Sequence, residues 1–415
     1  MQRVIYQELK SERGFWLALG VIALVTLTGL GAALFMEHSG HIVTGMDNRI
    51  VWGMPHVFAI FLIVAASGAL NVASVGSVFG REAYKPLARF STLLAMALLI
   101  GGLAVLVLDL GRPERLVVAM TNYNFKSIFT WNIFLYSGFV AVAAAYLFVM
   151  MARGTTWLTK PVGLVAFVWR LLLTTGTGSI FGWLVAREAY NAAVMAPLFI
   201  ALSLALGTAA FILATAGLFA LEGRAFQSGL VIRLGRLMGV FVAAVLYFTA
   251  VQHLTNLYAA QRLAVASFLL WSGGIFPLLF WIVQVALGAL IPLALVFLAS
   301  SRTAALLAAG LVLLGGFAQL YVIIIGGQAF PLMLFPGYEV SKTFLDGSVA
   351  SYSPSLPEVL LGLGGVAISL GIVLAGARIF RILPDRIIDE PSDRPKSAPA
   401  AVARAMPNVP AAAAR

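Results

Sequence analysis

The sequence predicts an all-α integral membrane protein with about ten transmembrane helices. Of its 415 residues, 61% are hydrophobic and only 10% are charged, which no ordinary soluble domain shows. A bilayer core of about 30 Å needs roughly 20 apolar residues for each helical crossing. The apolar runs are continuous rather than alternating with a period of two, so they favour helices over barrel strands.

Ten apolar runs are long enough to cross a membrane. In chain order they are Phe15–Met36, Val51–Phe79, Leu87–Leu110, Ser127–Met151, Pro161–Val185, Ala192–Leu221, Leu237–Ala260, Ser267–Ala299, Thr303–Ile325 and Pro357–Phe380. The polar start, Met1 to Arg13, leads directly into a full-length run. It therefore indicates a cytoplasmic leader and a retained first helix rather than a cleaved signal peptide.

The distribution of lysine and arginine sets the expected orientation. Seven of the 27 basic residues fall in the loops on one side, which are Arg49, Arg112, Arg115, Lys126, Arg187, Arg262 and Lys342. All the others except Arg170 fall on the side of the N-terminus. This positive-inside bias predicts that both termini are cytoplasmic. The net charge of +11 is therefore no sign of a nucleic-acid partner.

We expect two four-helix bundles followed by a helix pair. Residues 1–151 form a cytoplasmic leader and the first bundle, 152–300 the second bundle, and 301–383 the C-terminal pair with its long outer loop. The loop from Gly326 to Leu356 is aromatic, and it either docks a partner or folds as a cap over the last two helices. The Pro- and Ala-rich segment 384–415 is expected to be a disordered cytoplasmic tail.

The chain has no cysteine. Cysteine-ligated iron–sulfur clusters, thioether-linked haem and structural disulfides are therefore excluded. A dihaem cytochrome b is disfavoured as well, because it needs histidine pairs within helices at both leaflets. We therefore expect no haem, no iron–sulfur cluster and no metal in this chain.

All four histidines are expected near one membrane face, the outer one. His38, His41, His56 and His253 lie in loops or at helix ends on that side, and Asp109 joins them. Such a gathering of groups that exchange protons suggests proton-coupled chemistry at this face. Within this set, we expect His38 and His41 to be solvated loop residues.

A candidate site combines residues from the second, third and fourth runs. His56 and Asp109 lie at similar depth, and Asn132 and Tyr136 share one side of the next helix because they are four residues apart. Quinol oxidation needs hydrogen-bond partners for the ring oxygens and a group that exchanges protons. We assign His56 and Asp109 as catalytic, and these two with Asn132, Tyr136 and Arg112 as quinone-binding. Structural roles are the alternative, with Asp109 capping a turn or pairing with Arg112 and the amide and phenol joining helices.

A second set of polar residues could conduct protons. Arg170 lies about nine residues into its span, or roughly 14 Å deep, where an unpaired arginine is costly. The candidate proton path consists of Arg170, Thr174, Glu222 and His253. A structural role for Arg170 is the alternative, as is a polar cluster of His253 with its neighbours.

Two stretches carry a resemblance to a known family. The first runs from Val107 to Arg115 (Val-Leu-Asp-Leu-Gly-Arg-Pro-Glu-Arg) and continues with Asn124 to Asn132. The second comprises Gly178–Gly182, Arg187–Tyr190 and Met195–Phe199. Together they resemble the NrfD/PsrC family, the membrane subunits of polysulfide-reductase-like complexes. The ten-helix length is similar to the branch that includes the membrane subunits of some periplasmic nickel–iron hydrogenases, and the resemblance covers roughly residues 15 to 380.

The resemblance implies a quinone-reactive subunit without a redox cofactor of its own. Such proteins bind quinone near the outer face and exchange electrons with a periplasmic iron–sulfur subunit. That subunit serves a molybdopterin enzyme, a hydrogenase or a cytochrome. By position, the family's pocket residues would be His56, Asp109, Asn132 and Tyr136. Menaquinone and ubiquinone both remain open as the exchangeable substrate.

The sequence therefore predicts a quinone- or quinol-binding anchor of a respiratory oxidoreductase complex. We expect it to be a multi-pass protein of the bacterial cytoplasmic (inner) membrane, in contact with lipid, that is not catalytic alone and is a candidate for proton translocation. One alternative is a secondary transporter, which would have its site and broken helices at the midplane. The other is a passive anchor without a quinone site.

Overall fold

The computed structural model describes residues 5–152, 154–224, 226–332 and 347–384. The segment 385–415, which makes up nearly all of the expected C-terminal tail, lies outside the described residues. Part of the long loop, residues 333–346, does too.

Within the described residues, ten helical spans are long and apolar enough to cross a membrane, which confirms the predicted all-α membrane fold. They are α1 (Arg13–Ser39), α2 with α3 (Met54–Ala69 and Asn71–Ser77), η2 with α4 (Glu82–Leu87 and Ala88–Leu108), α6 (Ile128–Met151), η4 with α7 (Thr156–Leu158 and Thr159–Gly182), α8 (Met195–Leu221), α9 (Ser228–Tyr258), the composite span Ile275–Ala299, the composite span Arg302–Ala329, and α15 (Leu356–Ile379).

The two composite spans mix α-helical and π-helical turns. The first comprises α11 (Ile275–Leu278), η7 (Leu279–Leu290), α12 (Ile291–Ala294) and η8 (Leu295–Ala299). The second comprises α13 (Arg302–Tyr321), η9 (Val322–Gly326) and α14 (Gly327–Ala329). Shorter pieces connect the spans: η1 (His41–Val43), η3 (Pro113–Arg115), α5 (Leu116–Thr121), η5 (Ala260–Arg262), α10 (Leu263–Ser267) and η6 (Phe268–Ser272). Two short strands, β1 (Tyr6–Gln7) and β2 (Leu383–Pro384), pair antiparallel.

The helix α9 begins at Ser228, well before the expected start at Leu237. The apolar run marks the stretch that can lie in lipid, whereas the helix itself continues outward through Arg233 and Arg236. Arg236 is exposed and donates to Ser300 Oγ at 3.0 Å, so its charge does not interrupt the helix.

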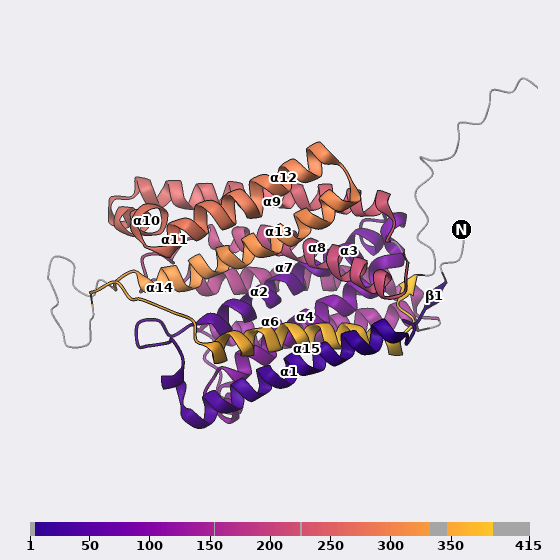
Figure 1. Cartoon of the computed structure of the whole chain (residues 1–415), viewed down its shortest axis with the longest axis horizontal. Coiled ribbons are helices and arrows are strands. Elements are labelled where there is room, and N and C mark those ends of the chain that lie inside the picture. Colours follow the sequence, from indigo (N-terminus) through magenta and orange to yellow (C-terminus); the bar gives the residue numbers. More distant parts are fainter. Residues whose placement is uncertain (1–4, 153, 225, 333–346, 385–415) are drawn as a thin grey trace, which may run out of the picture.

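Helices that are distant in the sequence pack side by side. The first span, α1, lies along the last one, α15, and α15 also packs on α4 (Figure 1). The helix α2 packs against α4 and α8, and α6 packs against α7, while α13 packs against α8, α9 and η7. The first and last spans thus form a pair beside the α2–α4 group. A cause is visible where α1 crosses α15, because a Cβ atom on Gly29 would lie 2.6 Å from Gly364 Cα.

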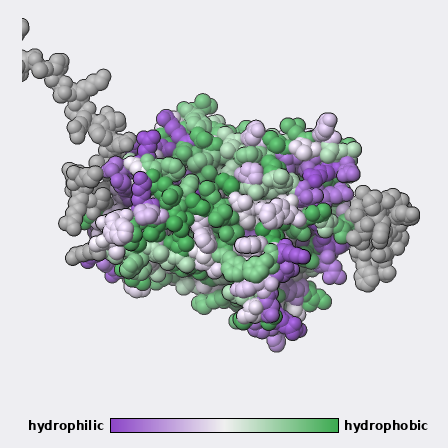
Figure 2. Space-filling view, turned by 180° about the vertical axis from the view of Figure 1, so that it is seen from behind, coloured by the Kyte–Doolittle hydropathy of each residue, from purple (hydrophilic) through white to green (hydrophobic). Residues whose placement is uncertain are grey.

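The helices run between two polar ends. We call one the histidine end, where α1 and α4 finish and α2 and α6 begin, and the other the sheet end, where β1 and β2 lie. Figure 2 shows hydrophobic side chains across the middle of the molecule and hydrophilic ones gathered toward both ends. This distribution is that of a protein spanning a bilayer.

The crossing of α2 and α8 depends on glycines, and we predict that it tolerates no added methyl group. A Cβ atom on Gly207 would lie 2.1 Å from Ala69 N, whereas one on Gly217, in the same helix, would meet nothing within 4 Å. Gly207→Ala should therefore lower stability by about 1–3 kcal/mol through overpacking. Gly217→Ala is the matched control and should leave it unchanged or slightly raised. Thermal unfolding of both variants in detergent checks this, and equal melting temperatures would contradict the close crossing.

Candidate functional site

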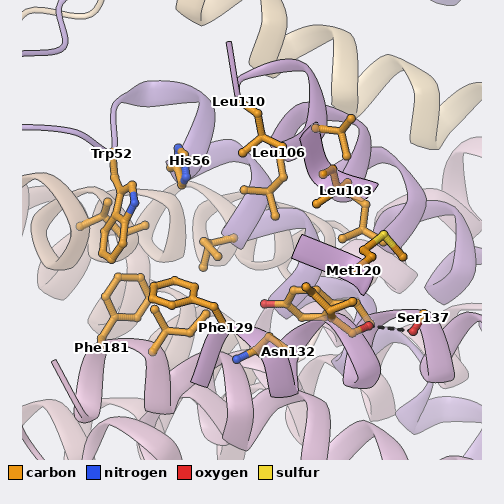
Figure 3. A pocket seen from close by; sticks show the side chains of 17 residues that line it. Trp52, His56, Leu103, Leu106, Leu110, Met120, Phe129, Asn132, Ser137 and Phe181 are labelled. Carbon is orange, nitrogen blue, oxygen red and sulfur yellow. Dashed lines mark hydrogen bonds between the residues drawn. The ribbon is translucent and has the colours of Figure 1, made fainter. Parts of the chain in front are cut away.

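A cavity of about 470 Å³ lies near the histidine end, between α2, α4, α6 and α7 (Figure 3). Most of its wall is aliphatic, from Ile60, Leu103, Leu106, Val107, Leu110, Leu116, Met120, Ile133, Ile180 and Ile324. Its polar groups are few, and they come from His56, Asn132, Tyr136 and Ser137. An apolar cleft of this size with a few convergent polar groups is typical of a small-molecule site.

Three aromatic side chains form one end of the cavity. Trp52 meets Phe181 edge-on with ring centroids 5.8 Å apart, and Phe129 at 6.3 Å (Figure 3). Trp52 also stacks on the His56 ring at 6.0 Å. Gln328 fixes the backbone here, because its Oε1 accepts from Trp52 N and its Nε2 donates to Trp52 O, both at 3.0 Å. This end of the cavity offers flat faces to a planar ring.

The polar centre of the site is a carboxylate between two histidines. His56 Nδ1 lies 2.9 Å from Asp109 Oδ2, and His41 Nε2 lies 3.9 Å from Asp109 Oδ1 and 3.1 Å from the Asp109 main-chain oxygen. The Asp109 side chain is 1% exposed, while those of His56 and His41 are 21% and 35% exposed. His56 lines the cavity and Asp109 lies behind it. Since Asp109 engages Nδ1 of His56, Nε2 of that ring is left for a ligand.

The two histidines keep the buried carboxyl ionised. Burial by itself would raise the pKa of Asp109, but its contacts with His41 and His56 and their charges outweigh burial and hold the pKa below its usual range, even though Oδ1 has no hydrogen-bond partner among the described residues. In return, the hydrogen bond and charge of Asp109 raise the pKa of His41, against the opposing effect of partial burial. The arrangement is suited to taking up a proton beside the cavity.

Two polar side chains of α6 face the same cavity. The Nδ2 group of Asn132 donates to Ile128 O at 2.9 Å and to Gly176 O at 3.1 Å, which fixes the amide and leaves Oδ1 buried without a partner in the described structure. One turn further in, Tyr136 OH lies 3.2 Å from Thr177 Oγ1. The amide oxygen lies against Gly176 of α7, closed off from the cavity, so a ligand would reach it only after the Asn132 side chain turns.

The structure thus brings together four of the five residues expected in the quinone site. Arg112 is the exception, since it is exposed in the turn that precedes η3 and does not line the cavity. The Gly111 that precedes it has φ 69°, and the chain turns here before Leu116 and Met120 return to the cavity wall. Asp109 makes its contacts with His41 and His56, so the alternative in which it pairs with Arg112 is wrong.

The residues of the expected proton path lie in three separate places. Arg170 and Thr174 are buried in α7. Arg170 Nη2 donates to Asn71 Oδ1 at 3.0 Å, and Thr174 Oγ1 lies 2.5 Å from Ser67 Oγ. Glu222 caps α8 at the sheet end, where Arg224 donates to it at 2.5 Å. His253 lies in α9 against the Phe280 ring. The contacts on these residues do not connect the three places.

Sequence reasoning missed two members of the site. His41 lies in the loop, as expected, and its side chain is 35% exposed, but the sequence did not indicate its contact with Asp109; His38 is exposed as expected. The loop conformation that places His41 depends on the short helix η1 and could not be read from composition. Trp52 carried a better signal, since it stands shortly before His56 at the start of the same span.

These features define a class of protein: a helical membrane protein with an apolar cavity whose wall carries a histidine–carboxylate pair near one end of the helices. A comparison with known families identifies the class more closely. Residues 42–332 match the family described as polysulphide reductase, NrfD. The chain belongs to the NrfD family, as the sequence motifs predict.

Three relatives align over most of the chain. The Hdr-like menaquinol oxidoreductase integral membrane subunit of Archaeoglobus fulgidus is 30% identical over 89% of this chain and 94% of its own length. A protein of Halobacterium salinarum assigned as a dimethyl sulfoxide reductase membrane subunit is 27% identical over 88% and 92%. A selenate reductase subunit of Mesobacillus selenatarsenatis is 23% identical over 84% and 91%. The chain is thus similar to membrane subunits of oxidoreductases.

The contact between His41 and Asp109 gives a testable titration. Since Asp109 raises the pKa of His41, Asp109→Asn should lower it toward the ordinary value of about 6.5. The stabilisation from this pair is fully present below the unfolded-state pKa and is lost as the pH rises through the folded-state pKa of His41. Titration of ¹⁵N-labelled histidine by NMR measures the shift, with the exposed His38 as internal control. An unchanged His41 titration would show that the contact does not form.

Proposed function

We propose that this chain binds a quinol or quinone in the 470 Å³ cavity and serves as the quinone-reactive membrane subunit of an oxidoreductase complex. The observation that carries the proposal is the cavity wall, where His56 is held by a buried carboxylate beside an amide oxygen that has no partner in the described structure. The names of the relatives support it, because they describe a menaquinol oxidoreductase subunit and two reductase subunits.

The polar groups fit the two oxygens of a quinol ring. Nε2 of His56 would accept a hydrogen bond from one hydroxyl group, and Oδ1 of Asn132 would accept one from the other once this buried amide turns toward the ring. These groups come from facing helices, α2 and α6, so the ring would lie between them with its face toward Trp52 and Phe129 (Figure 3). The aliphatic wall of α4 and α5 would hold the first isoprenoid units of the tail.

The histidine–carboxylate–histidine arrangement provides a route for protons. Oxidation of a quinol to a quinone releases two electrons and two protons. Nε2 of His56 would take a proton from the ring hydroxyl, while Nδ1 gives its proton to Asp109 Oδ2, 2.9 Å away. Asp109 would pass it to His41, which is partly exposed, after a small rotation closes the 3.9 Å gap. The second proton follows the same route, and quinone reduction reverses it.

The electrons must leave through another subunit, because the chain has no cysteine to ligate a cluster. We propose an iron–sulfur subunit docked at the histidine end, serving a molybdopterin enzyme, a hydrogenase or a cytochrome. The basic residues flanking the spans on the sheet end support placing that end, and both termini, in the cytoplasm of a bacterial inner membrane. The histidine end then faces outward.

A row of buried polar groups supports a link from this site toward the sheet end. Starting at Tyr136, it passes Thr177 at 3.2 Å and continues in α7 with Thr174, which contacts Ser67. It then reaches Arg170, whose Nε and Nη1 are buried without a partner in the described structure. We propose these groups as a path for proton translocation. Glu222 and His253 lie elsewhere and have no part in it.

The two rival functions make different demands on the structure. A secondary transporter would place its binding site at broken helices in mid-membrane. In the described residues, α7 runs unbroken through its threonine- and glycine-rich stretch, and the large apolar cavity lies near one end of the helices. A passive anchor gives no reason for a buried carboxylate between two histidines beside a cavity.

The site predicts a loss of quinol-dependent turnover on substitution of the carboxylate. In membranes containing the assembled complex, Asp109→Asn should reduce quinol-dependent turnover by about 100-fold or more, because a positioned proton acceptor contributes on that scale. Dye-linked activity of the peripheral enzyme should be kept. The matched control is Glu114→Gln, an exposed carboxylate near Asp109 in sequence. Equal turnover in the two variants at equal assembly would favour the passive anchor.

The same assay separates a relay role of His41 from a structural one. His41→Gln leaves His56 and Asp109 in place, so quinol should still bind with a similar KM while kcat falls by about tenfold. Added imidazole buffer should restore part of that loss, because it can take the proton from Asp109 at the partly open position of His41. A rise in KM without buffer rescue would indicate that His41 only shapes the loop.

A further inference from the structure

A second large cavity lies at the sheet end, on the opposite side of the molecule from the quinone cavity. It measures about 420 Å³ and lies between η2, the start of α4, the end of α6 and the start of α7, with Tyr6 at its edge. We call it the basic cavity, after the cationic side chains Lys85, Arg89 and Lys160 that line it. Hydroxyl groups make up most of the remaining polar lining, from Tyr6, Ser77, Thr156 and Thr159.

Two of the three cations have no carboxylate partner among the described residues. The guanidinium of Arg89 is held in place by Met150 O at 2.6 Å and Arg381 O at 3.1 Å, and it lies 3.8 Å from the centre of the Tyr6 ring. These contacts fix the charge without neutralising it. Lys160 forms no ion pair within the described chain, and Lys85 pairs with the exposed Glu82 at 2.6 Å. The cavity therefore has an excess of positive charge.

The position of the cavity indicates which kind of anion would reach it. It lies where the spans leave the apolar belt, and the neighbouring Trp157 is 74% exposed and Phe79 is 59% exposed. Exposed aromatic side chains at such a level are typical of the zone of lipid headgroups. Basic pockets between transmembrane helices bind phosphate headgroups, and each cation near a charged membrane surface adds to the attraction.

We infer that the basic cavity binds the phosphodiester headgroup of an anionic phospholipid. Lys85 and Lys160 supply exposed cations, Arg89 supplies a cation held in place, and the threonine hydroxyls would donate to the phosphate oxygens. The inference is independent of the quinone proposal, since none of these residues lines the quinone cavity or contacts His56 or Asp109.

The test measures lipid binding by the full-length protein in detergent. Native mass spectrometry with phosphatidylglycerol and with phosphatidylcholine gives the relative affinity for the two headgroups. We expect wild type to prefer phosphatidylglycerol. In the double variant Lys85→Gln/Lys160→Gln the affinity for phosphatidylglycerol should fall by about 30-fold, because each removed cation costs about fivefold. Both side chains are exposed, so the fold should survive.

A matched control uses a lysine at the same end of the molecule. Lys10 is exposed and does not line the basic cavity, so Lys10→Gln should keep the preference for phosphatidylglycerol. An equal loss of affinity for phosphatidylglycerol in this control would show that the effect comes from net charge alone, and it would refute the proposed lipid site. Unchanged affinity in the double variant would overturn it as well.

Inorganic phosphate distinguishes a lipid from a soluble anion. At millimolar concentrations it should raise the melting temperature of wild type by less than phosphatidylglycerol does, because it lacks the acyl chains that lie along the helices. A larger increase with inorganic phosphate, lost in the double variant, would assign the cavity to a soluble phosphate and overturn the lipid inference.

Discussion

The site depends on one buried ionised group, Asp109, at the end of α4. A carboxylate with a side chain 1% exposed is costly in an apolar surrounding unless partners hold its charge. Here two imidazoles do so, one from the cavity wall and one from the preceding loop. The same contacts that stabilise the charge also join the cavity to the aqueous face, so the stability of this corner of the fold and its proposed chemistry have one cause.

The remaining helices hold these groups at fixed depth. The helix α2, which carries His56, crosses α8 so closely that a Cβ atom on Gly68 would lie 1.6 Å from Ser203 O. At the same end, the buried Glu358 accepts from Gly45 N at 2.8 Å and from Tyr352 OH at 2.6 Å. Through Tyr352 and Glu358, the described part of the long loop and the start of α15 are thereby tied to the loop that carries His41. A buried hydrogen-bonded network of this kind is rigid, as a proton relay requires.

Much of the fold followed from the sequence, because hydrocarbon thickness and continuous hydropathy determine where helices can cross. The proximity of His56 and Asp109 followed too, since both were placed at the same depth on neighbouring spans, and it is confirmed. Residues in turns were harder. The sequence did not predict that His41 contacts Asp109, and it placed Arg112 in the site although Arg112 does not line the cavity. Both positions depend on the turns at Gly40 and Gly111, with φ of 78° and 69°, and hydropathy does not determine these turns. The packing of the first span against the last could not be predicted from the sequence either, since it depends on contacts between two segments that are distant in the chain.

Quinone binding in the cavity is measured most directly by photolabelling with an azido-quinone in membranes, followed by mapping of the labelled peptides. We expect labels on the segments that surround the cavity, above all Trp52–Ile60 and Phe129–Ser137, and their loss in competition with unlabelled quinol. Competable labels confined to α9 and the composite span Ile275–Ala299 would contradict it, because they would place the quinone in the other helix group.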